Sequence, residues 1–188
     1  AEAELARHRE AHATVHRLCK AARGDNPYRL PFERYVLASF LDDVLVRANL
    51  RLHKMTGGRF SLHRSDTIDG RRRGGLDLAV EDLHTGTRRR AATLSGGEGF
   101  QAALSLALGL SDTVQARCGG VHMDSLFIDE GFGSLGEEDL DRVLTTLEEM
   151  GAGRMIGLIS HVRELRDRIP TRIEVHKSPA GSRIEVTA

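Results

Sequence analysis

Three short stretches of the sequence carry side chains that could act on a phosphate group and on water. Residues 95–98 (Ser-Gly-Gly-Glu) open an apolar segment with helical spacing. Residues 129–130 (Asp-Glu) and 160–161 (Ser-His) each directly follow a short apolar run that is typical of a buried parallel strand. Because ligands of open α/β sheets bind outside the carboxyl ends of the strands, we expect the two carboxylates and the histidine to share one sheet edge.

The stretch 95–98 has the pattern of a capping box, in which Ser95 caps the helix and Glu98 reaches back to its amide. This accounts for the serine and the glutamate, but each glycine costs a helix about 1 kcal/mol relative to alanine. Glycines here permit close approach to the backbone, and the free amides and the helix dipole favour an anion. We therefore expect phosphate contact at this helix start, with a capping box alone as the alternative.

The acidic pair and the histidine suit the chemistry of a phosphate ester. One carboxylate at the sheet edge could hold Mg²⁺ near a phosphate, and the other could orient or deprotonate an attacking water. His161 could donate a hydrogen bond to a phosphate oxygen. Taken singly, each has a simple structural alternative, namely an acidic turn after a strand and a structural histidine. The acids at 137–139, after the small-residue loop 133–136, are equally explained by the dipole of the helix that they begin.

The remaining sequence predicts the elements that position these groups. Helices that alternate with buried strands from 94 to 169 indicate an α/β fold with a parallel sheet flanked by helices. Pro31 suits the first turn of a long amphipathic helix. Its expected buried stripe is Phe32, Val36, Phe40, Val44, Leu45, Ala48 and Leu52. The predicted helices span 1–22, 31–56, 94–115, 137–150 and 162–169; the predicted strands span 59–62, 76–80, a segment up to Thr93, 125–128, 155–159 and a closing hairpin, 172–177 with 183–187.

Composition narrows the classes of function. The 188 residues suit one domain, and 27 basic against 27 acidic residues give a formal net charge of zero. This balance argues against a nucleic-acid coat or a polybasic membrane binder. No apolar run approaches the roughly 20 residues of a membrane span, and the two cysteines lack metal-site spacing, so we expect a cytoplasmic protein with reduced thiols. The arginine triplets 71–73 and 88–90 could contact DNA phosphates, with solvated surface charge as the alternative.

The order of the motifs resembles that of ABC-type ATPases. Residues 94–98 resemble the ABC signature, 126–130 the Walker B strand, 134–136 the D-loop, and His161 the switch histidine. Residues 94–115 (LSGGEGFQAALSLALGLSDTVQ), 126–148 and 26–62 are similar to the SbcC family, the SMC-like ATPase subunits of bacterial SbcCD nuclease complexes. Glu98 replaces the glutamine usual in transporters, which fits SMC-like proteins. Gly99 and Gly136 stand where threonine and an acid are expected.

One motif of an ABC ATPase is absent from the sequence. None of the three lysines follows a glycine, so there is no P-loop of the form G-x-x-x-x-G-K-[ST]. In the proteins it resembles, the P-loop (Walker A) lies in an amino-terminal lobe beyond a long coiled coil. The resemblance thus implies that residues 1–24 end a returning coiled coil and residues 25–188 form the C-terminal lobe of an ABC-type ATPase head. Ala1 would mark an interior cut, and the fragment alone would be inactive.

The resemblance also implies a role for each motif. Two heads would sandwich ATP, with Asp129 supporting Mg²⁺, Glu130 acting as general base for water and His161 sensing the γ-phosphate. Both ATP and Mg²⁺ would require the missing amino-terminal lobe. The residues expected to meet the nucleotide of the partner head, or to lie at the seam between heads, are Leu94, Ser95, Gly96, Gly97, Glu98, Ser134 and Leu135.

The function so implied is to couple ATP binding, hydrolysis and head dimerisation to DNA end processing in double-strand break repair and recombination. The expected partners are the amino-terminal ATPase lobe, a second head, an SbcD-like nuclease subunit and double-stranded DNA, with no membrane and a nucleoid-associated location. One alternative is a module that only docks the nuclease or DNA through the helix 31–56 and the coil. Others are another SMC-like head, such as RecN, or a transporter head, which would lack that helix.

Overall fold

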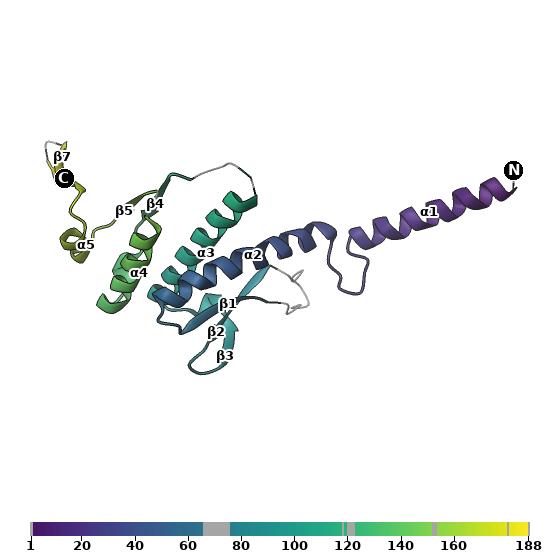
Figure 1. Ribbon diagram of the computed structural model, residues 1–188, viewed down its shortest axis with the longest axis horizontal. Coiled ribbons are helices and arrows are strands. Elements are labelled where there is room, and N and C mark those ends of the chain that lie inside the picture. The colour runs from purple at the N-terminus through teal and green to yellow at the C-terminus, as the bar shows by residue number, and fades with distance from the viewer. Residues whose placement is uncertain are drawn as a thin grey trace. The chain divides into compact units, whose positions relative to one another are not determined.

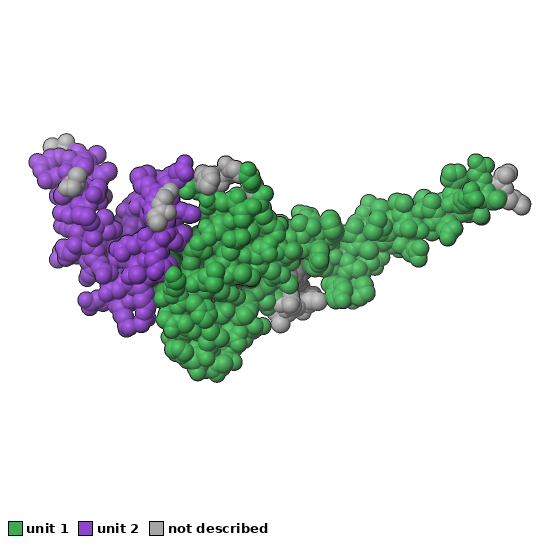
Figure 2. Space-filling view, in the orientation of Figure 1, with its two compact units in different colours: residues 1–123 green, residues 124–188 purple. Residues whose placement is uncertain are grey.

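The computed structural model describes residues 2–65, 76–117, 119, 123–151, 154–179 and 181–187 (Figure 1). The chain divides into two compact units, residues 1–123 and 124–188 (Figure 2). The arginine triplet 71–73 lies outside the described residues. Over the described ranges, no helix is both long and apolar enough to cross a membrane. The predicted boundary at residue 24 stays a prediction.

The first unit contains two long helices around a small antiparallel sheet, after a terminal helix whose described side chains are all exposed. The sheet order is β1-β2-β3, with Leu62 opposite Val80. The predicted strands and helices are confirmed, except that residues 91–93 form a 3₁₀ turn instead of extending the third strand. The elements are α1 (Glu2–Ala22), α2 (Phe32–Met55), β1 (Phe60–Ser65), β2 (Asp77–Asp82), β3 (Thr87–Arg90), η1 (Ala91–Thr93) and α3 (Gly96–Arg117).

The core of this unit lies between the second half of α2, the sheet and α3. A Cβ atom on Gly109 of α3 would lie 2.7 Å from the carbonyl oxygen of Val44 and 2.8 Å from the amide nitrogen of Ala48. The two helices therefore touch backbone to backbone at this glycine. The buried core cluster is Leu45, Leu52, Phe60, Leu62, Val80 and Ala102, against which Leu41, Leu78, Ala91, Leu94 and Leu106 pack.

Substituting Gly109 with alanine is expected to lower the free energy of unfolding by about 1–3 kcal/mol, because the new methyl group must push the backbone of α2 away. Gly99 is the matched control on the same helix, since a Cβ there meets nothing within 4 Å. Gly99→Ala should leave stability unchanged or raise it by up to about 1 kcal/mol. Urea denaturation of the 188-residue chain measures both. Equal losses for the two variants would contradict the close helix contact.

The predicted apolar stripe of α2 is only half right. Val44, Leu45, Ala48 and Leu52 are buried as expected. Phe32, however, is 62% exposed and Val36 is 47% exposed, so the prediction that they are buried is wrong. The physical reason is that Leu41 is the first residue of α2 that packs on the core cluster, so among the described residues the start of the stripe lies outside that cluster.

The second unit contains a two-stranded parallel sheet, two helices and a β-hairpin. The parallel pairing of β4 with β5 is confirmed, with Phe127 opposite Gly157. The predicted hairpin and the helix 137–150 are also confirmed, and the four inward positions predicted for that helix are all buried. The elements are β4 (Ser125–Asp129), η2 (Phe132–Ser134), α4 (Glu137–Met150), β5 (Met155–Ile159), α5 (Arg163–Arg168), β6 (Arg172–Ser178) and β7 (Gly181–Thr187).

The prediction that β4 and β5 are buried strands is wrong for one of their faces. Phe127 is 64% exposed, and Met155 and Ile159, which belong to the same outward face, are also exposed. The ring of Phe127 lies over Gly157, where a Cβ atom would approach it to 2.6 Å. Parallel sheets are normally covered on both faces, and the alternation along both strands leaves only the opposite face covered.

Candidate functional site

The start of α3 has the predicted capping box. The amide of Ser95 donates to Oε2 of Glu98 at 3.0 Å, and the amide of Glu98 donates to Oγ of Ser95 at 3.4 Å. Ser95 and Gly96 are exposed. Among the described glycines, neither Gly96 nor Gly97 has a positive φ, so no turn geometry explains them. The explanation that both glycines let a phosphate approach the backbone therefore stays a prediction.

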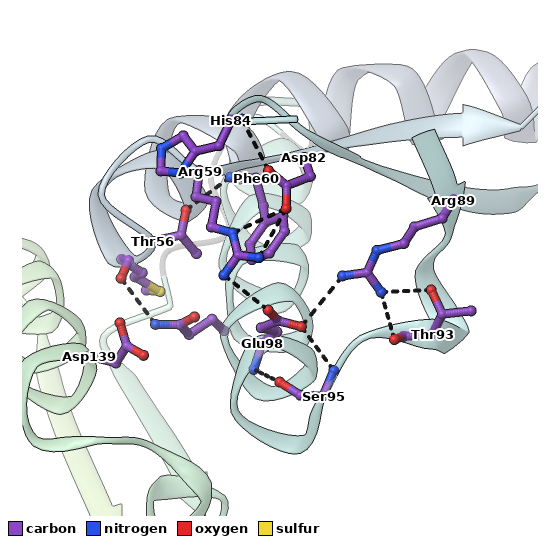
Figure 3. Close-up of polar contacts among 12 residues, drawn as sticks. Thr56, Arg59, Phe60, Asp82, His84, Arg89, Thr93, Ser95, Glu98 and Asp139 are labelled. Carbon is purple, nitrogen blue, oxygen red and sulfur yellow. Dashed lines mark hydrogen bonds and ion pairs between the residues drawn. The ribbon is translucent and has the colours of Figure 1, made fainter. Parts of the chain in front are cut away.

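Two arginines that we did not predict hold the carboxylate of Glu98 (Figure 3). Nη1 of Arg59 lies 3.4 Å from Oε1, and Nη2 of Arg89 lies 3.6 Å from Oε2. Arg59 also donates from Nε and Nη2 to Oδ2 of Asp82, at 3.1 and 3.0 Å. Asp82 is only 5% exposed. The start of α3 is thus tied to the sheet through charged groups.

The surroundings of Glu98 and Asp82 lower the pKa of both carboxyls. Burial acts to raise the pKa of Glu98 above its ordinary 4.5, but the hydrogen bonds from Ser95 and the charges of Arg59 and Arg89 outweigh it. Burial acts in the same direction on Asp82, whose pKa still lies below 3.8 because of hydrogen bonds from Arg59 and from the amides of His84 and Thr85, and of the charge of Arg59. Both groups are therefore more readily ionised in the folded chain.

Acid is expected to destabilise the chain through these two groups. A lowered folded pKa contributes stability that is present above the unfolded values, 3.8 and 4.5, and is lost as pH falls through the lower folded values. The free energy of unfolding, measured by urea denaturation from neutral pH into the range below 3.8, should therefore fall. An Asp82→Asn, Glu98→Gln double variant should lose less over the same range. An identical acid loss in both proteins would contradict this origin.

The second predicted site lies at the carboxyl end of β4 and β5. Asp129 is the last residue of β4, and the amide of Glu130 donates to the carbonyl of Ile159 at 2.9 Å, which continues the strand pairing. Glu130 has a φ of +59°, a left-handed conformation that is uncommon for a non-glycine residue. Residues held in such conformations cluster at active sites and cost of order 1–3 kcal/mol each. The backbone therefore marks Glu130 as a functional candidate independently of its side chain.

The structure brings Glu130 and His161 together. Nδ1 of His161 lies 3.0 Å from Oε2 of Glu130, and because a carboxylate can only accept, the histidine donates this hydrogen bond. Both side chains are exposed. Gly133 lies beside the imidazole, since a Cβ there would be 3.8 Å from Nε2, an ordinary van der Waals distance. Their direct contact confirms the expectation that these two groups lie at the same edge of the sheet.

The remaining predicted residues are placed as follows. Asp129 is exposed, and no hydrogen bond or ion pair joins its side chain to another residue in the described ranges. Ser134 is exposed and its hydroxyl donates to the carbonyl of Gly131 at 2.8 Å, while Leu135 is half-buried. Leu94 packs on the core of the first unit, so its side chain is structural. The set 94–98 belongs to the first unit, and 129–135 with His161 to the second.

The carboxylates at this sheet edge could supply only some of the ligands of a Mg²⁺ ion. Within the described ranges, no group of three or more histidine, cysteine, aspartate and glutamate side chains could hold a metal ion. Mg²⁺ is commonly bound by one or two carboxylates together with phosphate oxygens and water. Asp129 alone fits that pattern, because its carboxylate is exposed and is not committed to another described side chain.

The fold is that of an SMC ATPase head. One solved structure, from work on ATP-driven dimerization and DNA-stimulated activation of SMC ATPases, matches with a TM-score of 0.65 at 14% identity, over 82% of this chain and 89% of that one. The Smc head domain of Pyrococcus yayanosii matches with a TM-score of 0.61 at 17% identity, over 79% of this chain and 27% of that one.

Sequence comparison narrows this class to a family. Residues 66–149 match the family model described as SbcC/RAD50-like, Walker B motif. The SbcC subunit of the SbcCD nuclease of Treponema pallidum is 48% identical over 96% of this chain, and that of Vibrio cholerae is 50% identical over 90%. The chain belongs to the SbcC/RAD50-like family. It spans only 18% and 17% of the length of those two relatives.

Proposed function

We propose that this chain is the carboxy-terminal lobe of an ABC-type ATPase head, residues 25–188, with residues 1–24 ending a coiled coil. The lobe supplies half of each of two ATP sites and acts only with an amino-terminal lobe that carries the P-loop. In that assembly, ATP binding and hydrolysis control the pairing of heads. The pairing in turn controls DNA end processing by an SbcD-like nuclease subunit in double-strand break repair and recombination.

The observation that carries this proposal is the contact between Glu130 and His161 at the carboxyl ends of β4 and β5. Two groups 31 residues apart meet at the edge where ligands of α/β sheets bind. The left-handed backbone of Glu130 is the kind of strain found at active sites. A merely acidic turn after a strand requires neither feature.

The proposed chemistry assigns one task to each side chain. Glu130 accepts a proton from the attacking water, and the hydrogen bond from His161 orients the carboxylate before the nucleotide arrives. When the nucleotide binds, the imidazole of His161 donates to the γ-phosphate instead. The carboxylate of Glu130 is thereby released from its hydrogen bond with His161. Asp129 is the protein ligand for Mg²⁺, which neutralises phosphate charge when bound. Ser134 and Leu135 lie at the seam between paired heads.

The start of α3 serves the nucleotide of the opposite head. Ser95 is exposed, and the first amides of the helix have no partner within it, so they suit a phosphate oxygen. The capping box fixes the serine backbone, and Gly96 and Gly97 carry no side chain that would block a phosphate. This contact closes the sandwich, and so makes head pairing depend on ATP.

The experiment that tests this function combines the lobe with its amino-terminal P-loop lobe. Phosphate release and sedimentation are measured with and without ATP and Mg²⁺. We expect hydrolysis only when both lobes are present, and dimers of heads only with ATP. Hydrolysis by the 188-residue chain alone, or ATP binding by the joined lobes without any pairing, would contradict the proposal.

A second candidate function, a docking module for the nuclease subunit or DNA, is favoured by the exposed apolar side chains of α2. Phe32 and Tyr35 are both more than half exposed, and both precede Leu41, the first residue of the helix that packs on the core cluster. The two candidates differ in their dependence on nucleotide. Capture of the nuclease subunit or DNA by a lobe that never pairs with ATP would favour docking as the whole function.

A further inference from the structure

Arg59 lies in the connection between the end of α2 and the start of β1. The helix ends in a turn with Gly57 and Gly58 at φ values of +59° and +82°, closed by a hydrogen bond from the amide of Gly58 to the carbonyl of His53 at 2.7 Å. Only a glycine enters this region readily, so the pair reverses the chain sharply. This turn places the next residue, Arg59, at the start of β1 and beside the beginning of α3 (Figure 3).

The guanidinium of Arg59 is fixed on three sides. Nε and Nη2 donate to Oδ2 of the buried Asp82, while Nη1 faces Oε1 of Glu98 at 3.4 Å. The ring of Phe60 lies beneath, with its centroid 4.5 Å from Cζ. A planar group with several fixed donors can meet two carboxylates and an aromatic face at once, whereas a lysine ammonium cannot. This geometry makes the arginine a rigid bridge.

Glu98 uses its two oxygens for different tasks. Oε1 faces Arg59, and Oε2 accepts the amide hydrogen of Ser95 at 3.0 Å. Nη2 of Arg89 lies 3.6 Å from the same Oε2, and its Nη1 donates to the carbonyl of Thr93 at 2.6 Å. The carboxylate orientation that holds the Ser95 amide is therefore set by the arginines, with Arg59 making the shorter ion pair.

We propose that Arg59 is a positioning residue, which holds Ser95 in place for its phosphate contact by fixing the carboxylate of Glu98 against Asp82. This inference rests on the proposed function, since it deepens the role given to Ser95. It assigns a task in ATP-driven pairing to a residue that lies 36 positions earlier in the sequence and outside every nucleotide motif. The proposal gives Arg59 no contact of its own with the attacking water or with the phosphate.

The test uses the full-length protein that carries this lobe, and measures the ATP concentration for half-maximal head pairing by sedimentation. Removing Arg59 alone would leave Asp82 buried without its charge partner, which could unfold the sheet. The comparison is therefore between Asp82→Asn and the double variant Arg59→Met, Asp82→Asn. We expect about a tenfold higher ATP requirement in the double variant, the effect of losing one charge-assisted contact.

Two further variants separate positioning from a general structural role. Glu98→Gln keeps a side-chain oxygen for the Ser95 amide but loses the negative charge that Arg59 contacts. If Arg59 acts through Glu98, adding Arg59→Met to an Asp82→Asn, Glu98→Gln background should raise the ATP requirement no further. Arg88→Met, on β3 of the same sheet, is the control for loss of a basic side chain, because Arg88 pairs with Glu81. It should leave pairing unchanged.

The outcomes distinguish this inference from the function on which it rests. An unchanged ATP requirement in the folded Arg59→Met, Asp82→Asn variant, with normal ATP-driven pairing of the parent, overturns the role of Arg59 alone. Full additivity with Glu98→Gln also overturns it, because Arg59 would then act by another route. If the unmodified protein fails to pair with ATP, the proposed function itself is wrong.

Discussion

A Glu130→Gln variant of the reassembled head is expected to lose ATP hydrolysis while keeping ATP-driven pairing of heads. Glutamine preserves the shape of the side chain and an oxygen that can accept the hydrogen bond from His161, but it cannot take a proton from water. Loss of a general base typically lowers turnover by about 10²–10⁴-fold. Phosphate release measures the chemistry, and sedimentation in ATP measures the pairing.

The matched control for this variant is Glu148→Gln, which removes an exposed carboxylate from α4 in the same unit. It should leave both phosphate release and pairing unchanged. Unchanged turnover of Glu130→Gln would remove Glu130 from the role of base. Loss of pairing together with turnover would show that its carboxylate serves assembly instead.

A Ser95→Arg variant is expected to weaken ATP-driven pairing strongly. Ser95 is exposed at the start of α3, so a long side chain can be placed there without disturbing the core. Its bulk and charge would occupy the space that the proposed nucleotide of the opposite head must enter. Removing a central contact of an interface costs about 2 kcal/mol or more, so pairing should weaken by at least about 30-fold.

Ser95→Thr is the control for this variant, because threonine retains a hydroxyl that can cap the helix. It should pair more strongly than Ser95→Arg, and thermal unfolding of the 188-residue chain verifies that both variants fold. Normal ATP-dependent dimers of Ser95→Arg would contradict the contact between Ser95 and the opposite nucleotide.

Local patterns predicted much of the fold and the grouping of the candidate site. The capping box of Ser95 and Glu98 depends only on residues three apart, and the structure confirms it. The helix 137–150 carries its own apolar periodicity, and its bounds are confirmed. The meeting of Glu130 with His161 could be expected because both follow strands of one parallel pair.

Features that depend on distant packing could not be predicted in this way. Arg59 carries no motif, and its role emerges only when the turn after α2 places it between Asp82 and Glu98. The spacing of apolar residues likewise cannot show which part of an apolar helix or strand face packs against another element of the chain. Phe32 is exposed for this reason, and so is Phe127, although strand patterning favoured burial of both strands of its sheet.

The central claim is that Ser95 and Glu130 of one head serve different nucleotides, and mixing two defective heads tests it most directly. Ser95→Ala heads and Glu130→Gln heads are assayed for phosphate release, separately and then together, at saturating ATP. If each site takes Ser95 from one head and Glu130 from the other, a mixed pair contains one intact site. Turnover of the mixture should then exceed the sum of the two separate activities. A mixture no more active than that sum, although mixed dimers form, would contradict the claim.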